Sequence, residues 1–442
     1  MASEGYLPRW TLRTEGVIAP DERLPLGPSI VLGLQHVVAM FGATVLAPLL
    51  MGFDPNIAIL FSGVGTLIFF LVVGGRVPSY LGSSFAFIAV VIAATSYAGS
   101  GRNPNIGVAL AGIVAAGALY ALIGVIVMAI GYRWVERLMP PVVTGAIVAV
   151  IGLNLAPIAV KSVSASPFDT WIGIATIVAV GIIAVAAPGF ARRLPILLGG
   201  LAGYLLYAVL ANGFAFGKPI DWSGVVNAAW IGAPNFTSPT WDPHAMALIA
   251  PVAIVLVAEN LGHVKAVSAM TGRNLDRYLG RAFLGDGIAT MLAGFGGGTG
   301  VTTYAENIGV MAVTRIYSSL VFVIAAVAAI VLGFSPKFGA LIMTIPGPVL
   351  GGLSIVVFGL IAATGGRIWV QNQVDFARAR NLVTAAVTLT VGAGDLSLKL
   401  FGFTLGGIGT ATLVAIVLYQ ILREGGSETD VVGTADSAVD SR

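Results

Sequence analysis

The chain has 442 residues, of which 57% are hydrophobic and only 10% are charged. Soluble domains are about a quarter charged, so this composition excludes a protein whose main solvent is water. The mean hydropathy is +0.95, and apolar runs long enough to cross a bilayer recur along the chain. The sequence therefore predicts an all-α polytopic membrane protein, and the absence of cysteine excludes disulfides and thiolate metal sites.

The apolar runs predict fourteen membrane segments in two halves of seven. Those of the first half cover residues 28–50, 56–74, 79–98, 106–131, 140–160, 169–187 and 194–212. Those of the second half cover residues 245–270, 278–295, 298–314, 317–334, 338–362, 381–394 and 404–422. Residues 1–24 are expected to be a cytoplasmic N-terminal segment, and residues 423–442, which are polar and small, a disordered cytoplasmic tail.

The Lys and Arg residues orient these segments. With the N-terminus placed in the cytoplasm, 17 of the 23 fall on the cytoplasmic side, 5 on the outer side, and Lys265 within a segment. Cytoplasmic loops carry such an excess of positive charge. We therefore expect a protein of the cell membrane with both termini in the cytoplasm.

Two of the segments have irregular sequence. The third contains PSYLGSS at residues 78–84, and the tenth contains GGGTGVTT at residues 296–303. Each run starts a helix poorly and is followed by good helical sequence. Extended backbone is tolerated at membrane depth only where it is buried in protein or lines a cavity, so each run predicts a short extended piece leading into a half-helix.

The two halves also resemble one another. Residues 141–145 match residues 348–352 at an offset of 207, and residues 83–86 match residues 302–305 at an offset of 219. Seven segments per half is an odd number, so the halves must be inverted relative to one another. Inverted repeats with broken helices at matching positions indicate a transporter site; chance similarity between apolar segments is the alternative.

Two carboxylates fall inside the predicted bilayer, Glu259 in the eighth segment and Glu306 in the tenth. A charge at the bilayer centre costs about 2.5–3.5 kcal/mol on insertion scales, and such residues are functional by default. His263 lies four residues after Glu259 and therefore on the same helix face. A structural acid satisfied by this His is the alternative. For Lys265, snorkelling or a structural ion pair is favoured over substrate contact.

The sequence around Glu306 suggests what could bind. Glu306 starts a half-helix whose free backbone N–H groups favour acceptor atoms, and the mirrored start at Phe85 should offer a second set. Two sets of donors and two carboxylate acceptors suit a small flat molecule that carries both N–H groups and carbonyl groups.

Other polar residues in the segments are more ambiguous. Asp286 in the ninth segment is a proton relay, a partner of the site or a structural acid. Gln35 and His36 form a polar pair in the first segment, where a lone buried His is more often a packing residue than a ligand. Phe358 faces the site if the repeat alignment is correct. No phosphate-binding loop, zinc-protease motif or nucleophile elbow is present, so the energy source would be an ion gradient.

At these residues the chain resembles the nucleobase–ascorbate transporter (nucleobase:cation symporter) family, and within it the bacterial uracil permeases. The family signature reads here as Glu306-Asn307-Ile308-Gly309 followed by Thr314-Arg315. The Gln35-His36 pair, the break at residues 82–87 and the helix with Glu259, Gly262 and His263 are further family features. The resemblance covers residues 25–422.

The resemblance implies a seven-plus-seven fold with two domains. The core domain would comprise residues 25–131 and 244–334, and the gate domain residues 132–243 and 335–422. The family implies substrate binding by Glu259, Glu306, Phe85, Ala305, Tyr304 and Phe358. It implies proton coupling at His263, and we expect Glu259 and Asp286 to take part, with Gln35, His36, Ser84, Thr303 and Asn307 in support.

The expected function is proton-coupled import of uracil or a related pyrimidine base. A purine symporter of the same family stays open, because Asp286 resembles the purine branch, Phe358 replaces a Tyr common in uracil permeases and Ala305 replaces a Gly. An anion transporter of the same architecture is the further alternative. Sodium could replace the proton. No enzymatic activity, cofactor, metal or nucleic-acid partner is expected, and a homodimer is expected from the family alone.

Overall fold

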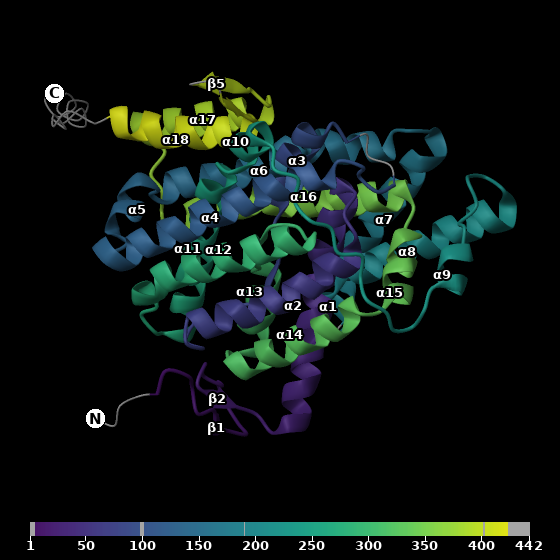
Figure 1. The fold of residues 1–442 in the computed structure, drawn as a ribbon, viewed down its shortest axis with the longest axis horizontal. Coiled ribbons are helices and arrows are strands. Elements are labelled where there is room, and N and C mark those ends of the chain that lie inside the picture. The colour runs from purple at the N-terminus through teal and green to yellow at the C-terminus, as the bar shows by residue number, and fades with distance from the viewer. Residues whose placement is uncertain (1–4, 98–100, 190, 401–402, 423–442) are drawn as a thin grey trace, which may run out of the picture.

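The computed structural model describes residues 5–97, 101–189, 191–400 and 403–422, most of which are helical (Figure 1). The expected disordered tail, residues 423–442, lies outside the described residues. The helices are α1 (Leu26–Met51), α2 (Pro55–Val72), α3 (Ile88–Thr95), α4 (Ile106–Ile130), α5 (Arg133–Leu138), α6 (Pro141–Val163), α7 (Pro167–Ala186), α8 (Pro195–Ala208), α9 (Ser223–Asn227), α10 (Pro243–Ile249), α11 (Val252–Thr271), α12 (Leu279–Gly296), α13 (Ala305–Thr314), α14 (Ser319–Gly333), α15 (Pro336–Met343), α16 (Gly347–Gln371), α17 (Ala379–Ala393) and α18 (Gly407–Ile421).

Short elements complete the chain. The strands are β1 (Thr11–Leu12), β2 (Glu22–Arg23), β3 (Leu81–Ser83), β4 (Val301–Thr303), β5 (Leu398–Leu400) and β6 (Phe403–Leu405). Short 3-10 helices are η1 (Phe85–Phe87), η2 (Ala191–Arg193) and η4 (Asp276–Tyr278), and η3 (Val209–Gly213) is a π-helical turn that follows α8.

The helices begin close to where the apolar runs predict them. Within the described ranges, eight are long and apolar enough to cross a membrane, or nine if α14 and α15 form one bent span. The other predicted segments correspond to α12, which carries charged residues, and to the short helices α3, α13, α17 and α18. The multi-pass character is thus confirmed, and the total of fourteen segments stays a prediction.

The predicted twelfth segment, residues 338–362, is wrong in position. The chain turns by 81° between α14 and α15, and the long helix is α16 at residues 347–371. Proline explains the difference, because it starts helices readily but disrupts their interiors. Pro336 lies in the first turn of α15, and Pro346 precedes the first turn of α16. An apolar run therefore holds two helices with different directions.

The third and tenth segments contain the extended pieces that the sequence predicts. β3 and β4 form an antiparallel pair, with Leu81 opposite Thr303 and Ser83 opposite Val301. η1 and α3 follow β3, and α13 follows β4. The offset of 219 between the repeats is wrong by one residue, because the residues that precede the two helix starts are Ser84 and Tyr304, 220 residues apart.

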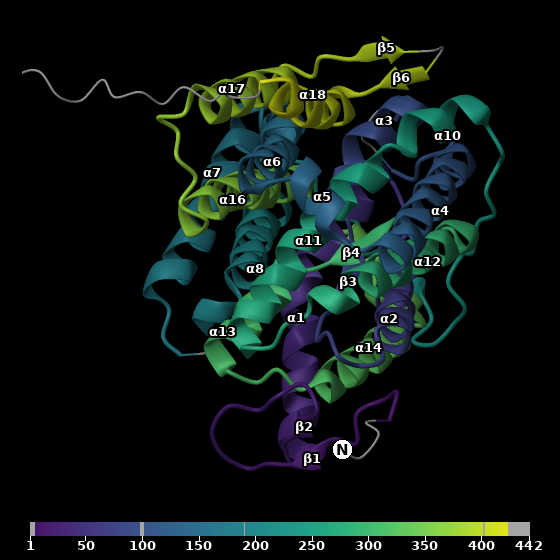
Figure 2. The ribbon, with the colours of Figure 1, turned by 90° about the vertical axis from the view of Figure 1, so that its left-hand side faces the viewer.

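Glycine allows close packing between the longest helices. α6 packs along α16, α4 along α12 and α2 along α14. A Cβ atom on Gly365 of α16 would lie 2.7 Å from the Ala149 backbone N of α6, and one on Gly124 of α4 would lie 2.5 Å from the Leu284 N of α12. Small residues permit this approach in membrane proteins. Figure 2 shows β3 and β4 at the centre, with α1, α2, α11 and α12 around them.

The N-terminal residues 5–24, here called the strap, are hydrogen-bonded to the chain between α13 and α14. Ile18 is 1% exposed; its N–H donates to the Arg315 carbonyl at 3.1 Å, and its own carbonyl accepts from the Tyr317 N–H at 2.8 Å. Trp10 Nε1 donates to Ser319 Oγ at 3.0 Å. The strap thus fixes the loop between α13 and α14, which the expectation of a polar cytoplasmic segment did not foresee.

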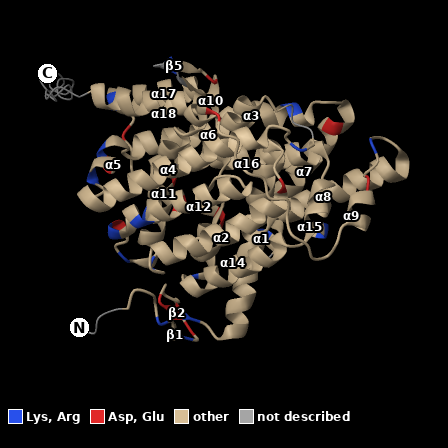
Figure 3. Ribbon diagram, viewed as in Figure 1, with Lys and Arg blue, Asp and Glu red and all other residues tan. Residues whose placement is uncertain are grey.

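Charged side chains are sparse along the helices and gather near their ends (Figure 3). Lys and Arg gather around α5 and the nearby ends of α11 and α12, at the left of that view. Charge confined to helix ends is the pattern expected of helices that cross a membrane.

Candidate functional site

The broken segments meet at the centre of the molecule. The Ser84 N–H donates to the Gly300 carbonyl at 2.9 Å and the Tyr304 N–H to the Tyr80 carbonyl at 3.0 Å, which extends the strand pair at both ends. A threonine from each neighbouring helix holds one strand. Thr66 of α2 accepts from the Leu81 N–H at 2.9 Å, and Thr290 of α12 accepts from the Val301 N–H at 3.2 Å. The site is therefore built on backbone that is hydrogen-bonded on both sides.

Glu259 and His263 project from α11, which packs against η1, β4 and α13. His263 Nδ1 lies 2.8 Å from Thr303 Oγ1 of β4. Glu259 is half-buried, and its Oε2 has no hydrogen-bond partner within the described residues. His263 thus bonds to the strand and not to Glu259, which removes the simple alternative in which this His satisfies the acid.

Glu306 occupies the first turn of α13, directly after β4. The side chain of Tyr304 does not cap this helix start, so the Ala305 N–H is available as a donor. Asn307 beside it is fully buried, and its Nδ2 lies 2.9 Å from His36 Nδ1 and 3.1 Å from the His36 carbonyl. His36 and Asn307 therefore join α1 to α13, and their supporting role in the site stays a prediction.

Aromatic rings and small residues shape the opposite half-helix. The rings of Phe85 and Phe358 meet edge to face with centroids 5.8 Å apart, which brings η1 against α16. Ser84 Oγ caps the start of η1 by accepting from the Ala86 N–H at 3.3 Å. Ala305 is the first residue of α13 and therefore the counterpart of Phe85.

Tyr304 is placed differently from a residue that faces a ligand. Its hydroxyl donates to the Ser83 carbonyl at 2.8 Å and accepts from Thr44 Oγ1 at 3.2 Å. A Cβ atom on Gly82 would lie 2.5 Å from its ring. The Tyr304 side chain thus packs over the strand pair, and any contact of this residue with a substrate would involve its backbone. Gln35 on α1 is buried, with an Nε2 that has no partner among the described residues.

Asp286 belongs to a buried network that the sequence analysis did not identify. Its Oδ2 accepts from Asn260 Nδ2 at 2.7 Å, and the Tyr120 hydroxyl lies 3.4 Å away. Asn260 Nδ2 also lies 2.9 Å from the Tyr120 hydroxyl oxygen. Two features of the sequence could have indicated this network. Asn260 directly follows Glu259, and Tyr120 lies in an apolar segment, where a buried Tyr hydroxyl needs a hydrogen-bond partner. The network joins α4, α11 and α12 through Asn260, the residue next to Glu259.

The described residues contain no group of three or more His, Asp or Glu side chains placed to hold a metal ion. The chemistry that the centre offers is hydrogen bonding, with carboxylate acceptors at Glu259 and Glu306 and backbone donors at the two half-helix starts.

Comparisons with known proteins identify relatives over nearly the whole chain. The model of the Permease family matches residues 27–400. The chain is 63% identical over 426 residues to a protein of Escherichia coli strain K12 named putative pyrimidine permease RutG, with 96% of each chain covered. It is 42% identical to the uracil permease of Paenibacillus larvae, with 91% of this chain and 96% of that one covered. It is 38% identical to the uracil permease of E. coli strain K12, with 93% and 95% covered.

Solved structures with this fold are more distant in sequence. The transmembrane domain of the cyanobacterial bicarbonate transporter BicA superposes with a TM-score of 0.59 at 16% identity, over 89% of this chain and 97% of that one. SLC26A9 superposes with a TM-score of 0.60 at 12% identity, over 90% of this chain and 65% of that one. These two show the fold alone. The family match and the relatives together show that the chain belongs to the nucleobase–ascorbate transporter family of permeases.

Proposed function

We propose that this protein is a proton-coupled symporter that imports uracil or a closely related pyrimidine base across the cell membrane. The observation that carries the proposal is Glu259, which presents a buried oxygen with no partner among the described residues, beside the strand pair and both half-helices. An unsatisfied buried acceptor costs about 1–3 kcal/mol. A ligand with N–H groups would remove this cost, and a nucleobase carries such groups at its edge.

The backbone supports the same class of solute. The half-helix starts at Phe85 and Ala305 offer N–H donors, which suit the carbonyl oxygens of a pyrimidine. The names of the relatives, which are uracil and pyrimidine permeases, agree with this assignment. An anion is disfavoured, although the fold is shared with a bicarbonate transporter, because Glu259 and Glu306 would repel it.

We propose the fourteen-segment arrangement with inverted halves as the frame of this site. The packing of α4 on α12 has a counterpart in that of α14 on α2, and the pair α7–α8 has one in α17–α18. Exchanging the halves of the chain relates each pair to its counterpart. The core domain would consist of residues 25–131 and 244–334, and the gate domain of residues 132–243 and 335–422.

Glu259 and His263 are proposed to carry the coupling proton. Both lie on α11, and His263 contacts Thr303 of β4, so a change in protonation would reach the strand pair directly. Asp286 would assist through Asn260, which neighbours Glu259 in the chain. Intramembrane acids are common elements of proton relays.

Uptake of labelled bases tests the function. Cells that lack their own uracil uptake and express this chain should accumulate uracil, and the rate should fall when the proton gradient is abolished. Glu259→Gln should lower uptake at least ten-fold at equal membrane abundance. Glu15→Gln, which makes the same change at an exposed position, should leave uptake unchanged.

The same assay separates the two branches of the family. Unlabelled uracil should inhibit the uptake of labelled uracil far more strongly than unlabelled xanthine does. Faster entry of xanthine than of uracil would assign the chain to the purine symporters, and entry of neither base above control cells would refute the proposal. Replacing sodium at fixed pH identifies the coupling ion.

A further inference from the structure

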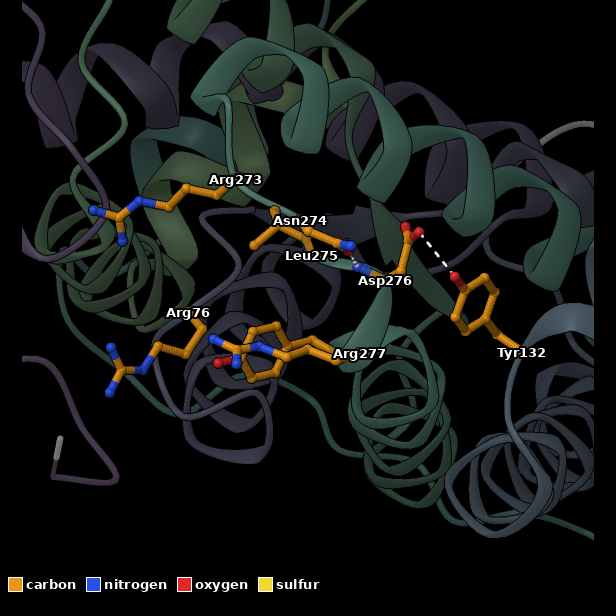
Figure 4. Close-up of a pocket in the computed structure, with 8 residues that line it drawn as sticks. Arg76, Tyr132, Arg273, Asn274, Leu275, Asp276 and Arg277 are labelled. Carbon is orange, nitrogen blue, oxygen red and sulfur yellow. Dashed lines mark hydrogen bonds between the residues drawn. The ribbon is translucent and has the colours of Figure 1, made fainter. Parts of the chain in front are cut away.

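A cavity of about 550 Å³ lies away from the central site, at the helix ends where positive charge gathers. It is lined by Arg76 after α2, by residues 273–278 between α11 and α12, and by Tyr132 between α4 and α5. Figure 4 shows the side chains of Arg76, Arg273 and Arg277 on one side of this cavity, with Asp276 turned toward Tyr132 on the other.

The carboxylates near the cavity are already paired. Asp276 accepts from the Tyr132 hydroxyl at 3.1 Å and lies 2.7 Å from Lys265 Nζ. Asp21 of the strap lies 2.6 Å from Arg273 Nη2. Asp276 is thus paired with Lys265, and Asp21 with Arg273, so among the described residues these two carboxylates are not paired with Arg277.

Arg277 is the arginine best placed to take a ligand. Its guanidinium lies 4.8 Å from the centre of the Tyr278 ring, which orients the planar group. No carboxylate of the described residues lies within 4.0 Å of it. Asn274 uses its Oδ1 to accept from the Asp276 N–H at 3.0 Å, so its Nδ2 donors remain for a ligand.

The chemistry of this lining matches a phosphate group. Guanidinium groups bind phosphate oxygens through paired, charge-assisted hydrogen bonds. Basic pockets at the cytoplasmic ends of membrane helices bind acidic lipid head groups. Leu71, five residues before Arg76, is 53% exposed and offers an apolar surface on the same helix end for an acyl chain.

We propose that this pocket binds a phosphate-bearing anion, and that its source is the head group of an anionic membrane lipid. Arg277 would contact the phosphate oxygens, and Asn274 would donate a further hydrogen bond. The site is separate from the centre at Glu259, so the proposal does not depend on which solute the protein carries.

Thermal unfolding of the full chain in lipid nanodiscs tests the site and distinguishes the sources. One arm compares phosphatidylcholine discs with discs that contain phosphatidylglycerol, and the other adds inorganic phosphate to phosphatidylcholine discs. A rise of the unfolding midpoint by several degrees with phosphatidylglycerol alone is expected. A rise with inorganic phosphate alone would assign the pocket to a soluble anion.

Variants localise the effect. Arg277→Gln should remove most of the lipid-dependent rise, and Arg277→Lys should keep part of it, because Lys retains the charge without the planar fork. Arg137→Gln changes an exposed arginine on α5 outside the cavity and should behave as the wild type.

The proposal is overturned if Arg277→Gln and the wild type respond equally to phosphatidylglycerol and to inorganic phosphate. It is overturned equally if Arg137→Gln loses as much as Arg277→Gln, because general surface charge would then explain the effect. Uracil uptake measured in parallel shows whether the central site is intact.

Discussion

Two neighbouring threonines of β4, Thr302 and Thr303, are expected to differ in their importance for transport. Thr303 and Thr302 are both 1% exposed. Thr303 Oγ1 lies 2.8 Å from His263 Nδ1, whereas Thr302 Oγ1 is buried without a partner among the described residues. Removing one hydroxyl breaks a contact to α11, and removing the other relieves an unsatisfied group.

Thr303→Val should therefore lower uptake several-fold and alter its dependence on external pH, because His263 loses its hydrogen bond to β4. Thr302→Val should leave uptake near that of the wild type and raise thermal stability slightly. Initial rates of labelled uracil entry between pH 5 and pH 8 provide the measurement. Equal effects of the two substitutions would show that the His263 contact is not used.

Asn307 has a structural role that can be measured as stability. Asn307→Ala removes the contacts of Nδ2 with His36 Nδ1 and with the His36 carbonyl and leaves the buried Nδ1 without this partner, which should cost about 1–3 kcal/mol. Unfolding in detergent followed by light scattering gives the change in midpoint. Asn372→Ala, at an exposed residue after α16, serves as the control and should leave the midpoint unchanged.

At this scale the sequence predicted the acids but not their surroundings. Glu259, Glu306 and Asp286 stand out because charge is costly in an apolar segment. Their partners do not, because Thr and Tyr are ordinary residues of a membrane helix. Tyr120 reaches Asp286 across 166 residues of sequence, and no local pattern encodes that contact.

Among the helices, the close pair α6–α16 depends on which glycine faces the partner. A Cβ atom on Gly365 would meet the Gly145 carbonyl and Ala149, whereas one on Gly366 would have nothing within 4 Å. Gly365→Ala should destabilise the protein by roughly 1–3 kcal/mol through overpacking. Gly366→Ala should stabilise it by about 0.5–1 kcal/mol, because Ala favours the helix. Thermal unfolding of both variants provides the test, and loss of stability in both would contradict the packing.

The strap offers a second test among the elements. Ile18 is 1% exposed and bonded to the α13–α14 loop, whereas Val17 beside it is 43% exposed. Ile18→Ala should loosen the strap and increase hydrogen–deuterium exchange in residues 5–24 and 315–319, because a buried apolar group is lost. Val17→Ala should not change the exchange. Unchanged exchange in Ile18→Ala would mean that the strap does not hold this loop.

Elements were predictable where composition alone decides them. The long helices follow from apolar length, and the two breaks follow from Gly, Pro and Thr. The twelfth segment was misplaced because hydropathy records how apolar a stretch is and not where it turns. The order of the strap was not foreseen because its apolar residues are isolated and their partners lie about 300 positions away.

For the whole molecule, the absence of cysteine makes the proposed topology directly measurable. Ser164 follows α6 and Asn372 follows α16, and both are exposed. With both termini in the cytoplasm, a membrane-impermeant maleimide should label Ser164→Cys in intact cells. It should label Asn372→Cys only after permeabilisation. Labelling of both in intact cells would refute the arrangement of the segments, and the wild-type chain provides the unlabelled control.

The strand pair also sets a length. Ser84 bonds to Gly300, and Tyr304 lies four residues beyond Gly300, so the two half-helix starts stand about 13 Å apart along the strands. This spacing is fixed by backbone hydrogen bonds within one proposed domain, so it cannot change when that domain moves against the other. Phe358, which meets Phe85 from α16, belongs to the other proposed domain. The strand pair β3–β4 thus keeps the two half-helix starts at a constant distance. The choice between a one-ring pyrimidine and a two-ring purine would then depend on Phe358, the side chain that the other proposed domain contributes.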